Sequence, residues 1–481
     1  DVRGDGVAPR SDASAEVTTV IVVAPTGVDH PRFYLAEAIH EEVVARLGRL
    51  PRIRPQPRVD AERAPNDVIV RLACAERLAV TVEHRGEQVA TLSLPLAAEQ
   101  LEAAVATAID AVTRAIDLGA IRGETSQVGH ALDLMFRARH LAMRSIAGVQ
   151  EAVPMLLKAQ AEAAPNPKLA AMLAIAQVRL AFFTGTADPE VLTRARELAR
   201  RAVAAAPDQV LAHLAMGHVE LNTGDPVAAA SHFRVAIACA PHSSEAHEQL
   251  GRMLLEAGYL EPAIERLEDA IAINPNTKAA RWDIARAYAL DGRWDDSDRI
   301  VRELLASGVD RVIARARFAW WRRDAAALAA MQAQLATGPT PFVPGLMTEL
   351  IATFLDDDWP NHRARLLSVV AEMPPNRRRR AFVGQLVVEA AGYRRDIPTA
   401  IEHIARTIDE GMFDLHWLDR CPMLDEVRRS PAFPPLRARI KQRADAILDA
   451  LYGDHHLGTS ETALATDDVE PALAEALGLL R

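Results

Sequence analysis

Two consecutive stretches of 34 residues decide how this chain folds: residues 208–241, DQVLAHLAMGHVELNTGDPVAAASHFRVAIACAP, and residues 242–275, HSSEAHEQLGRMLLEAGYLEPAIERLEDAIAINP. Glycine, alanine and proline recur at the same offsets in both, and neighbouring stretches keep the same step. The residues that share the period are Pro207, Pro241 and Pro275; Gly217 and Gly251; Gly224, Gly258 and Gly292; Ala195, Ala229 and Ala263; and Ala202, Ala236 and Ala270. A repeat of this length indicates small structural units stacked in a row.

Each position of the repeat has a physical role in a helix–turn–helix unit. Gly217 stands where the two helices cross so closely that a side chain would clash, and Gly224 follows the first helix as a left-handed C-terminal cap. Ala229 gives the second helix a small contact surface, with Phe233 filling the core beside it. Pro241 cannot continue a helix and begins the next turn. The same roles fall to Gly251, Gly258, Ala263, Leu267 and Pro275.

These offsets resemble those of the tetratricopeptide repeat. The resemblance implies a mainly α fold, a right-handed α-solenoid in which the first helix of each pair lines the concave side. The match is good over residues 208–275, and in residues 276–309 Ala285 replaces the first glycine and Val309 the proline. Residues 174–207 match through their second helix only. Residues 131–165 form another expected pair, with about eight inserted residues around 184–190, so we expect an array over residues 131–309.

Helical patterning continues beyond this array as degenerate repeats, over residues 310–453. The expected helices are residues 313–321, 324–335, 344–355, 361–371, 381–392 and 399–410. Residues 413–440 resemble the closing segment of many bacterial repeat-bearing signalling proteins. We expect that segment to seal the last hydrophobic face, because a solenoid needs a cap for solubility.

The N-terminal residues 17–120 have a different pattern, that of a small α/β domain. Strands are expected at residues 17–24, 68–75, 78–84 and 88–94, and helices at 33–50 and 97–118, while the Pro/Arg-rich residues 51–65 are left without an element. The last two strands form an expected hairpin around Arg85–Gly86. This order resembles the TolB-like module, which in bacterial regulators usually follows a winged-helix, kinase or cyclase effector. Residues 1–16 would then be a linker, and from the missing initiator Met we expect either a processed product or a piece of a larger protein.

Composition limits the function further. The 481 residues carry 55 basic and 65 acidic side chains, a net charge of −10, which argues against direct nucleic-acid binding. No stretch of the sequence approaches the roughly 20 consecutive apolar residues of a membrane span, and residues 1–16 lack the apolar core of a signal peptide. We therefore expect a cytoplasmic protein.

No catalytic motif is evident in the sequence, which lacks a phosphate-binding glycine loop, a kinase signature and the GxSxG and HExxH patterns. The three cysteines, Cys74, Cys239 and Cys421, match no zinc or redox spacing and are expected to be free thiols. We predict no enzyme activity, no cofactor and no metal site.

Three polar segments allow a second interpretation. Residues 356–358, three aspartates, could bind a metal, but a solvated turn is favoured because a cation needs several more oxygen ligands. Arg377–Arg380 could pair with phosphate or an acidic partner, and a solvated helix start is favoured. His455–His456 could bind a metal weakly, and a flexible polar tail is favoured.

The acidic tail, residues 454–481, supplies half of the net charge. Val469, Leu473, Leu477 and Leu480 form one apolar stripe, which predicts either a short amphipathic helix that docks in cis or on a partner, or a frayed terminus.

The concave side of the array is the predicted binding surface. The resemblance places groove-facing residues near the first glycine of each repeat, and here they are His218, Asn222, Glu248, Arg252, Trp282 and Arg286. Arginine and tryptophan are enriched at binding hot spots, so we expect a peptide or protein ligand. The alternative is that Trp282 packs between repeats and the arginines are solvated. The predicted function is the non-catalytic sensor and interaction region of a bacterial signalling or transcriptional regulator; the alternative is a free-standing scaffold that assembles a protein complex.

Overall fold

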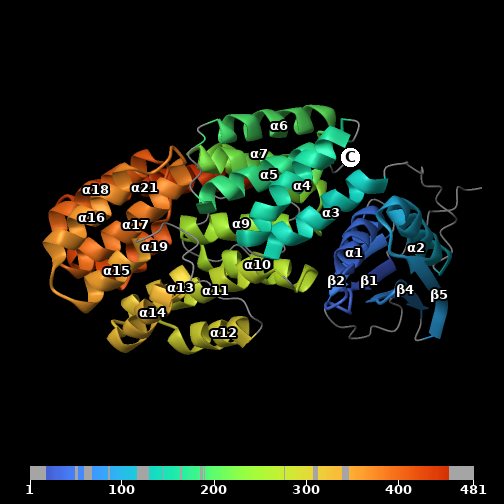
Figure 1. The fold of residues 1–481 in the computed structure, drawn as a ribbon, viewed down its shortest axis with the longest axis horizontal. Coiled ribbons are helices and arrows are strands. Elements are labelled where there is room, and N and C mark those ends of the chain that lie inside the picture. Colours follow the sequence, from blue (N-terminus) through green and yellow to red (C-terminus); the bar gives the residue numbers. More distant parts are fainter. Residues whose placement is uncertain are drawn as a thin grey trace, which may run out of the picture. The chain divides into compact units, whose positions relative to one another are not determined.

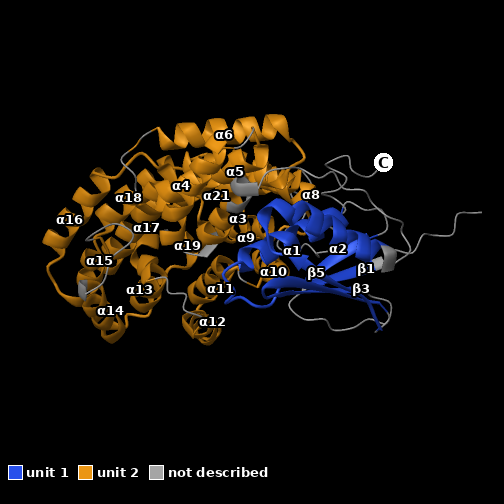
Figure 2. Ribbon diagram, turned by 45° about the vertical axis from the view of Figure 1, so that its right-hand side comes forward, with its two compact units in different colours: residues 1–127 blue, residues 128–481 orange. Residues whose placement is uncertain are grey.

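The computed structural model of the chain describes twelve segments separated by short gaps. They are residues 18–48, 53–58, 68–84, 87–115, 129–144, 146–162, 165–184, 188, 190–275, 277–306, 312–337 and 346–453. The chain divides into two compact units, residues 1–127 and residues 128–481 (Figure 2). The predicted linker 1–16, the Arg85–Gly86 turn, Val309, His455–His456 and the tail stripe lie outside the described residues.

In its described residues, the first unit is a five-stranded sheet with two α-helices. Its elements are β1 (Thr18–Val23), α1 (Phe33–Leu47), β2 (Ile53–Arg58), β3 (Val68–Cys74), β4 (Arg77–His84), β5 (Glu87–Pro95), a short 3-10 turn (Ala98–Gln100) and α2 (Leu101–Ala115). The strand order is β2-β1-β3-β4-β5, with β1 parallel to β2 and β3, and with β3, β4 and β5 antiparallel in series. The small α/β domain expected from the sequence is therefore present.

Strand β2 corrects the sequence interpretation, which left the Pro/Arg-rich stretch without an element. Pro55 and Pro57 pair with Val20 and Val22 of β1 at the edge of the sheet. An edge strand needs no N–H donor on its outer side, so it tolerates proline where an inner strand would not. Two prolines in six residues hid a strand that the alternation of buried and exposed positions would otherwise have indicated.

The second unit is built of helices, most of them in antiparallel pairs (Figure 1). The pairs are α3 (Gly129–Arg144) and α4 (Ile146–Glu162), α5 (Pro167–Thr184) and α6 (Val191–Ala205), α7 (Val210–Asn222) and α8 (Pro226–Cys239), α9 (Ser244–Ala257) and α10 (Leu260–Ile273), α11 (Lys278–Leu290) and α12 (Trp294–Ala306), α13 (Val312–Trp321) and α14 (Ala325–Thr337), α15 (Leu346–Leu355) and α16 (Trp359–Ala371), and α17 (Arg377–Tyr393) and α18 (Ile397–Asp409). Shorter elements close the unit: α19 (Leu415–Arg420), a 3-10 turn (Pro422–Leu424), α20 (Asp425–Arg428) and the longer α21 (Phe433–Tyr452).

The glycine roles predicted for the repeats are confirmed. A Cβ added to Gly217 would come within 2.3 Å of the Phe233 ring, and one on Gly251 would come within 2.8 Å of Leu267. Gly224, Gly258 and Gly292 have φ of +87°, +95° and +74°. Only glycine adopts this region without strain, so these residues end the first helix of each pair and turn the chain into the second.

Polar caps fix where the helices begin. The side chain of Asp225 accepts a hydrogen bond from the N–H of Ala228 at the start of α8, and Ser243 accepts one from Ala246 at the start of α9. These caps satisfy backbone donors that the first turn of a helix leaves unpaired. Of the stretch 184–190, where inserted residues were expected, Thr184 ends α5, which has 18 residues where α7 has 13, and residues 185–187 and 189 lie outside the described residues.

The C-terminal helices pack against the regular repeats, residues 208–275. One hydrophobic cluster of buried residues extends from Leu267 on α10 to Ile440 on α21. Helix α17 packs against α7, α19 against α9 and α11, and α21 against α8, α9 and α18. The closing segment therefore does more than seal the last helix pair, because it also packs against α8, α9 and α11 in the middle of the array.

Candidate functional site: the first-helix face of the repeats

The six predicted groove residues lie on the first helices of three successive pairs: His218 and Asn222 on α7, Glu248 and Arg252 on α9, and Trp282 and Arg286 on α11. Successive first helices contact one another from α5 to α7 and from α9 to α11. The structure places all six residues in intramolecular contacts.

Arg252 joins two neighbouring repeats. Its Nη2 lies 3.0 Å from Glu248 Oε1 on the same helix and 2.8 Å from Asp283 Oδ2 on α11. Burial alone would lower the pKa of the Arg252 guanidinium, but Asp283 and Glu248 outweigh burial and raise that pKa above its ordinary value. A quarter of the Arg252 side chain and 17% of the Asp283 side chain remain exposed. This cluster can therefore still meet a ligand.

Arg286 forms an ion pair with the closing segment. Its Nη2 lies 2.5 Å from Oδ2 of Asp414, the residue that caps α19 by accepting from the N–H of Trp417. Gln385 of α17 donates to the same carboxylate at 3.0 Å. Burial alone would raise the pKa of the Asp414 carboxyl, but Arg286 and these two donors hold it below its ordinary value. The Asp414 carboxylate at the start of α19 is therefore joined to α11 by the ion pair and to α17 by the hydrogen bond from Gln385.

The other groove residues are also used within the chain. Asn222 accepts a hydrogen bond of 3.0 Å from Asn376, the cap of α17. His218 meets the edge of the Phe233 ring and lies 3.8 Å from Glu245. Trp282 is only 2% exposed and packs beside Phe318 of α13. Trp282 therefore packs between repeats, as the alternative interpretation expected. The same interpretation expected solvated arginines, but Arg252 and Arg286 both form ion pairs.

The basic run at residues 377–380 differs from the favoured interpretation. Arg378 pairs with Glu256 of α9 and lies over the Phe413 ring, and the buried Arg379 donates to the carbonyl of Phe182 on α5. A solvated helix start is therefore wrong for these two residues. The partners stand more than a hundred positions away in the sequence, so no local spacing indicated them.

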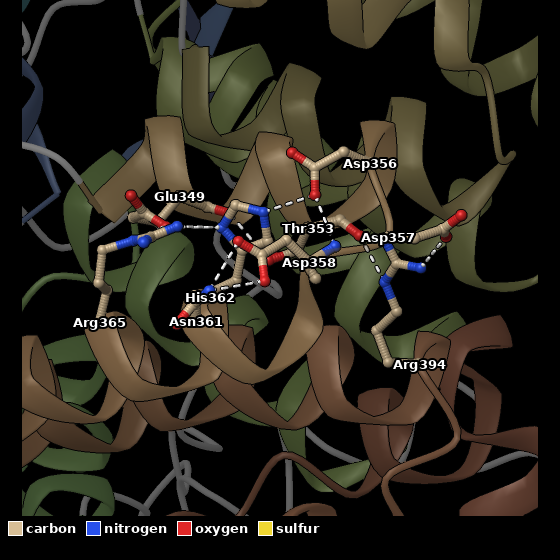
Figure 3. A network of polar contacts seen from close by, with 9 residues as sticks. All are labelled: Glu349, Thr353, Asp356, Asp357, Asp358, Asn361, His362, Arg365 and Arg394. Carbon is tan, nitrogen blue, oxygen red and sulfur yellow. Dashed lines mark hydrogen bonds and ion pairs between the residues drawn. The ribbon is translucent and has the colours of Figure 1, made fainter.

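The acidic turn at residues 356–358 is exposed, as favoured, yet it is not only a solvated turn (Figure 3). Asp356 accepts from the N–H of Asp358 at 2.9 Å and from Nε2 of the buried His362 at 2.7 Å. Within the described segments, no group of three or more His, Cys, Asp or Glu side chains is arranged to hold a metal. His362 and its second partner, Glu349, were not identified from the sequence.

Among the described residues, the three cysteines form no disulfide. Cys74 and Cys421 are buried, and burial raises the pKa of the Cys421 thiol well above its ordinary value. A thiol with a raised pKa is mostly protonated and therefore a poor nucleophile or metal ligand.

A family comparison identifies the helix pairs. Residues 254–317, from the end of α9 into α13, match the model of the tetratricopeptide repeat. Together with the glycine-based crossings and left-handed caps, this match shows that the helical unit has the α-solenoid architecture of tetratricopeptide repeats, and a small sheet domain precedes it in the sequence.

Comparison with solved structures finds matches at low sequence identity and low TM-score. The crystal structure of MamA is 21% identical, with 33% of this chain and 88% of that chain covered and a TM-score of 0.25. The C-terminal part of a tetratricopeptide repeat-containing protein from Cytophaga hutchinsonii is 13% identical, with 58% and 94% covered and a TM-score of 0.26. Yeast Tom70 is 14% identical, with 73% and 68% covered and a TM-score of 0.33. No curated protein matches the sequence.

One helix among the described residues, α5, is long and apolar enough to cross a membrane by length and composition. More than half of it, 56%, is buried inside the structure. Its central position between α4, α6 and α7 gives a packing reason for that composition.

Proposed function

We propose that this chain is a non-catalytic protein-interaction scaffold that binds a peptide or protein through the first-helix face of its repeats. The observation that carries the proposal is the repeat itself: helix pairs matched over residues 254–317 stack first helix on first helix. Such stacking creates an extended surface in which successive repeats each contribute a few side chains.

Within that face, the cluster of Glu248, Arg252 and Asp283 is the part that we assign to the partner. Its charges are mixed and partly exposed, whereas Trp282, Asn222 and Arg286 hold the fold together. A partner would meet the cluster by exchanging part of the internal pairing for its own charges, which favours a segment that carries both signs.

We further propose that this scaffold is the sensor and interaction region of a cytoplasmic bacterial signalling or transcriptional regulator. The support is the order of a small α/β domain followed by repeats, which resembles the TolB-like arrangement. In this proposal a winged-helix, kinase or cyclase effector stands upstream, and partner binding biases its activity. A coding sequence for such a domain before Asp1 distinguishes this role from that of a free-standing scaffold.

The test of the binding face is a charge swap. Arg252→Asp combined with Asp283→Arg keeps the net charge of the cluster but inverts its pattern. A matched control swaps Arg201 and Glu197, an exposed pair at 3.8 Å on the second helix α6. The proteins that cross-link to the native chain, to the Arg252/Asp283 swap and to the α6 swap are then quantified by mass spectrometry and compared.

The groove swap is expected to reduce capture of the main partner by about tenfold, the effect of a single lost charged contact of about 1.4 kcal/mol. The α6 swap is expected to leave capture unchanged, because its two residues lie on the second helix of a pair and not on the first-helix face. Equal capture by the native chain and the groove swap would show that the partner is not held through this face.

A further inference from the structure

A buried histidine lies between two carboxylates in the second unit, outside the proposed binding face (Figure 3). His362 is in the first turn of α16, and its side chain is 5% exposed. Its Nδ1 lies 2.8 Å from Glu349 Oε2 on α15, and its Nε2 lies 2.7 Å from Asp356 Oδ1 in the turn between the two helices. The ring therefore ties one helix, its partner and their connecting turn together.

Only the charged imidazolium can donate from both nitrogens at once. Burial alone would lower the pKa of His362, but its hydrogen bonds to Glu349 and Asp356 outweigh burial and raise the pKa above its ordinary value of 6.5. A neutral ring has one N–H, so one of the two carboxylates then faces a nitrogen lone pair and is repelled by it.

Arg365 determines which contact is lost. Its Nη2 lies 2.9 Å from Nδ1 of His362, and its Nε lies 2.7 Å from Glu349 Oε2. Once the ring is neutral, Nδ1 becomes an acceptor for Arg365, and Nε2–H keeps Asp356. The bond between His362 and Glu349 is the one that breaks, and Arg365 alone then joins that carboxylate to α16.

The turn between α15 and α16 also makes hydrogen bonds to the next helix pair, α17 and α18; these bonds are called the joint below. Arg394, directly after α17, donates to the carbonyl of Thr353 at 2.7 Å and to Asp357 at 2.9 Å. At the start of α16, Trp359 donates to Asp396, the cap of α18, at 3.0 Å. The turn can therefore pass a local change to the packing of α15 and α16 on α17 and α18.

We propose that His362 is a pH-operated latch: its doubly hydrogen-bonded imidazolium fixes the α15–α16 turn and the joint to α17–α18, and loss of the proton loosens both. The charged groups that face the ring are Glu349 from α15, Asp356 from the turn and Arg365 from α16, with Asp357, Asp358 and Arg394 beyond them. Because the folded-state pKa is raised, the latch is fully engaged below about pH 6.5 and is lost as the pH rises through the folded-state value.

The first test measures the proton directly. The full chain, labelled with carbon-13 at the histidine Cε1, is titrated by NMR, and the His362 signal is assigned by its loss in His362→Gln. We expect a midpoint above pH 6.5, moved down by Glu349→Gln or Asp356→Asn, because each removes a negative charge. Arg365→Gln is expected to move the midpoint up, because it removes a positive charge. A midpoint at or below pH 6.5, or one unmoved by all three substitutions, would overturn the proposal.

The second test measures the loosening. Amide hydrogen exchange, corrected for its intrinsic pH dependence, is followed in peptides from α15 and α16 from about pH 6 to about pH 9. The native chain is expected to protect these peptides more strongly than His362→Gln at the acid end, with the difference vanishing at the alkaline end.

The matched control is His403→Gln on α18, a buried histidine whose pKa is lowered by burial. It is expected to show no such convergence at alkaline pH. Parallel exchange curves for the native chain and His362→Gln over the whole range would show that the ring has only a structural role.

Discussion

The regular repeats at residues 208–275 and the C-terminal helices at residues 312–452 have the same helical architecture, but their interiors are held together differently. In the regular repeats the decisive contacts are those of shape, with Gly217 against the Phe233 ring. In the C-terminal helices they involve buried charge. Glu389 of α17 is fully buried and accepts hydrogen bonds from Arg317 and from the indoles of Trp320 and Trp417, each indole at 2.7 Å.

The difference shows which packing contacts of a repeat array can be recognised from its sequence. A shape contact between two helices of one pair recurs at a fixed offset, so every copy can be recognised from the sequence. A charge cluster between separate pairs joins residues such as Arg317 and Glu389, 72 positions apart, and has no offset to recur. The C-terminal helices have therefore lost the repeat pattern without losing precise packing.

The largest expected effect comes from breaking the Glu389 cluster. Glu389→Ala leaves the Arg317 guanidinium buried without its carboxylate and two indole N–H groups without an acceptor. Loss of one partner from a buried pair costs about 3–5 kcal/mol of unfolding free energy, measurable by chemical denaturation. Glu402→Ala on α18, which removes a half-exposed carboxylate, is the control and should cost less than about 1 kcal/mol. Equal losses in the two variants would contradict the contrast between the regions.

The next effect concerns the contact between the two regions. Arg286→Met removes the cation that pairs with Asp414, while Gln385 and the N–H of Trp417 remain as donors. We expect a loss of about 1.5–3 kcal/mol, the range for a hydrogen bond to a charged group.

The pH dependence of that loss provides its check. The native pKa of Asp414 is depressed, so its contribution is present above the unfolded pKa of about 3.8 and is lost as the pH falls through the folded-state value. The difference in stability between the native chain and Arg286→Met should therefore narrow in acid. A difference that stays constant with pH would mean that Arg286 acts through packing alone.

The same contrast explains how much could be predicted from the sequence. The repeat pattern predicted the helix pairs, the close crossing at Gly217 and the left-handed turn at Gly224. Both glycines are required by the local geometry of their own repeat, which recurs at a fixed offset. It also selected the first-helix face, on which Arg252 and Arg286 lie. It could not predict Asp283 or Asp414 as their partners, because those carboxylates come from other elements.

Breaking the shape contact should cost less than breaking a charge cluster. Gly217→Ala places a methyl group 2.3 Å from the Phe233 ring, and overpacking of this kind costs about 1–3 kcal/mol. Phe233→Leu in the same chain should recover part of the loss, because the smaller side chain makes room. A double-mutant cycle measures this coupling, and strictly additive losses would show that the crossing is not set by these two residues.

The smallest expected effect isolates the backbone from the packing. Gly292 has a φ of +74°, and a Cβ added to it meets no atom within 4 Å, so Gly292→Ala tests conformational strain alone. A left-handed alanine costs about 1–2 kcal/mol, and asparagine, which tolerates this region, should cost less. Thermal unfolding of Gly292→Ala and Gly292→Asn provides the comparison. If both variants lose as much as Gly217→Ala, strain rather than side-chain shape would dominate even the regular repeats, and the contrast with the charge-held helices would have to be drawn from the backbone instead.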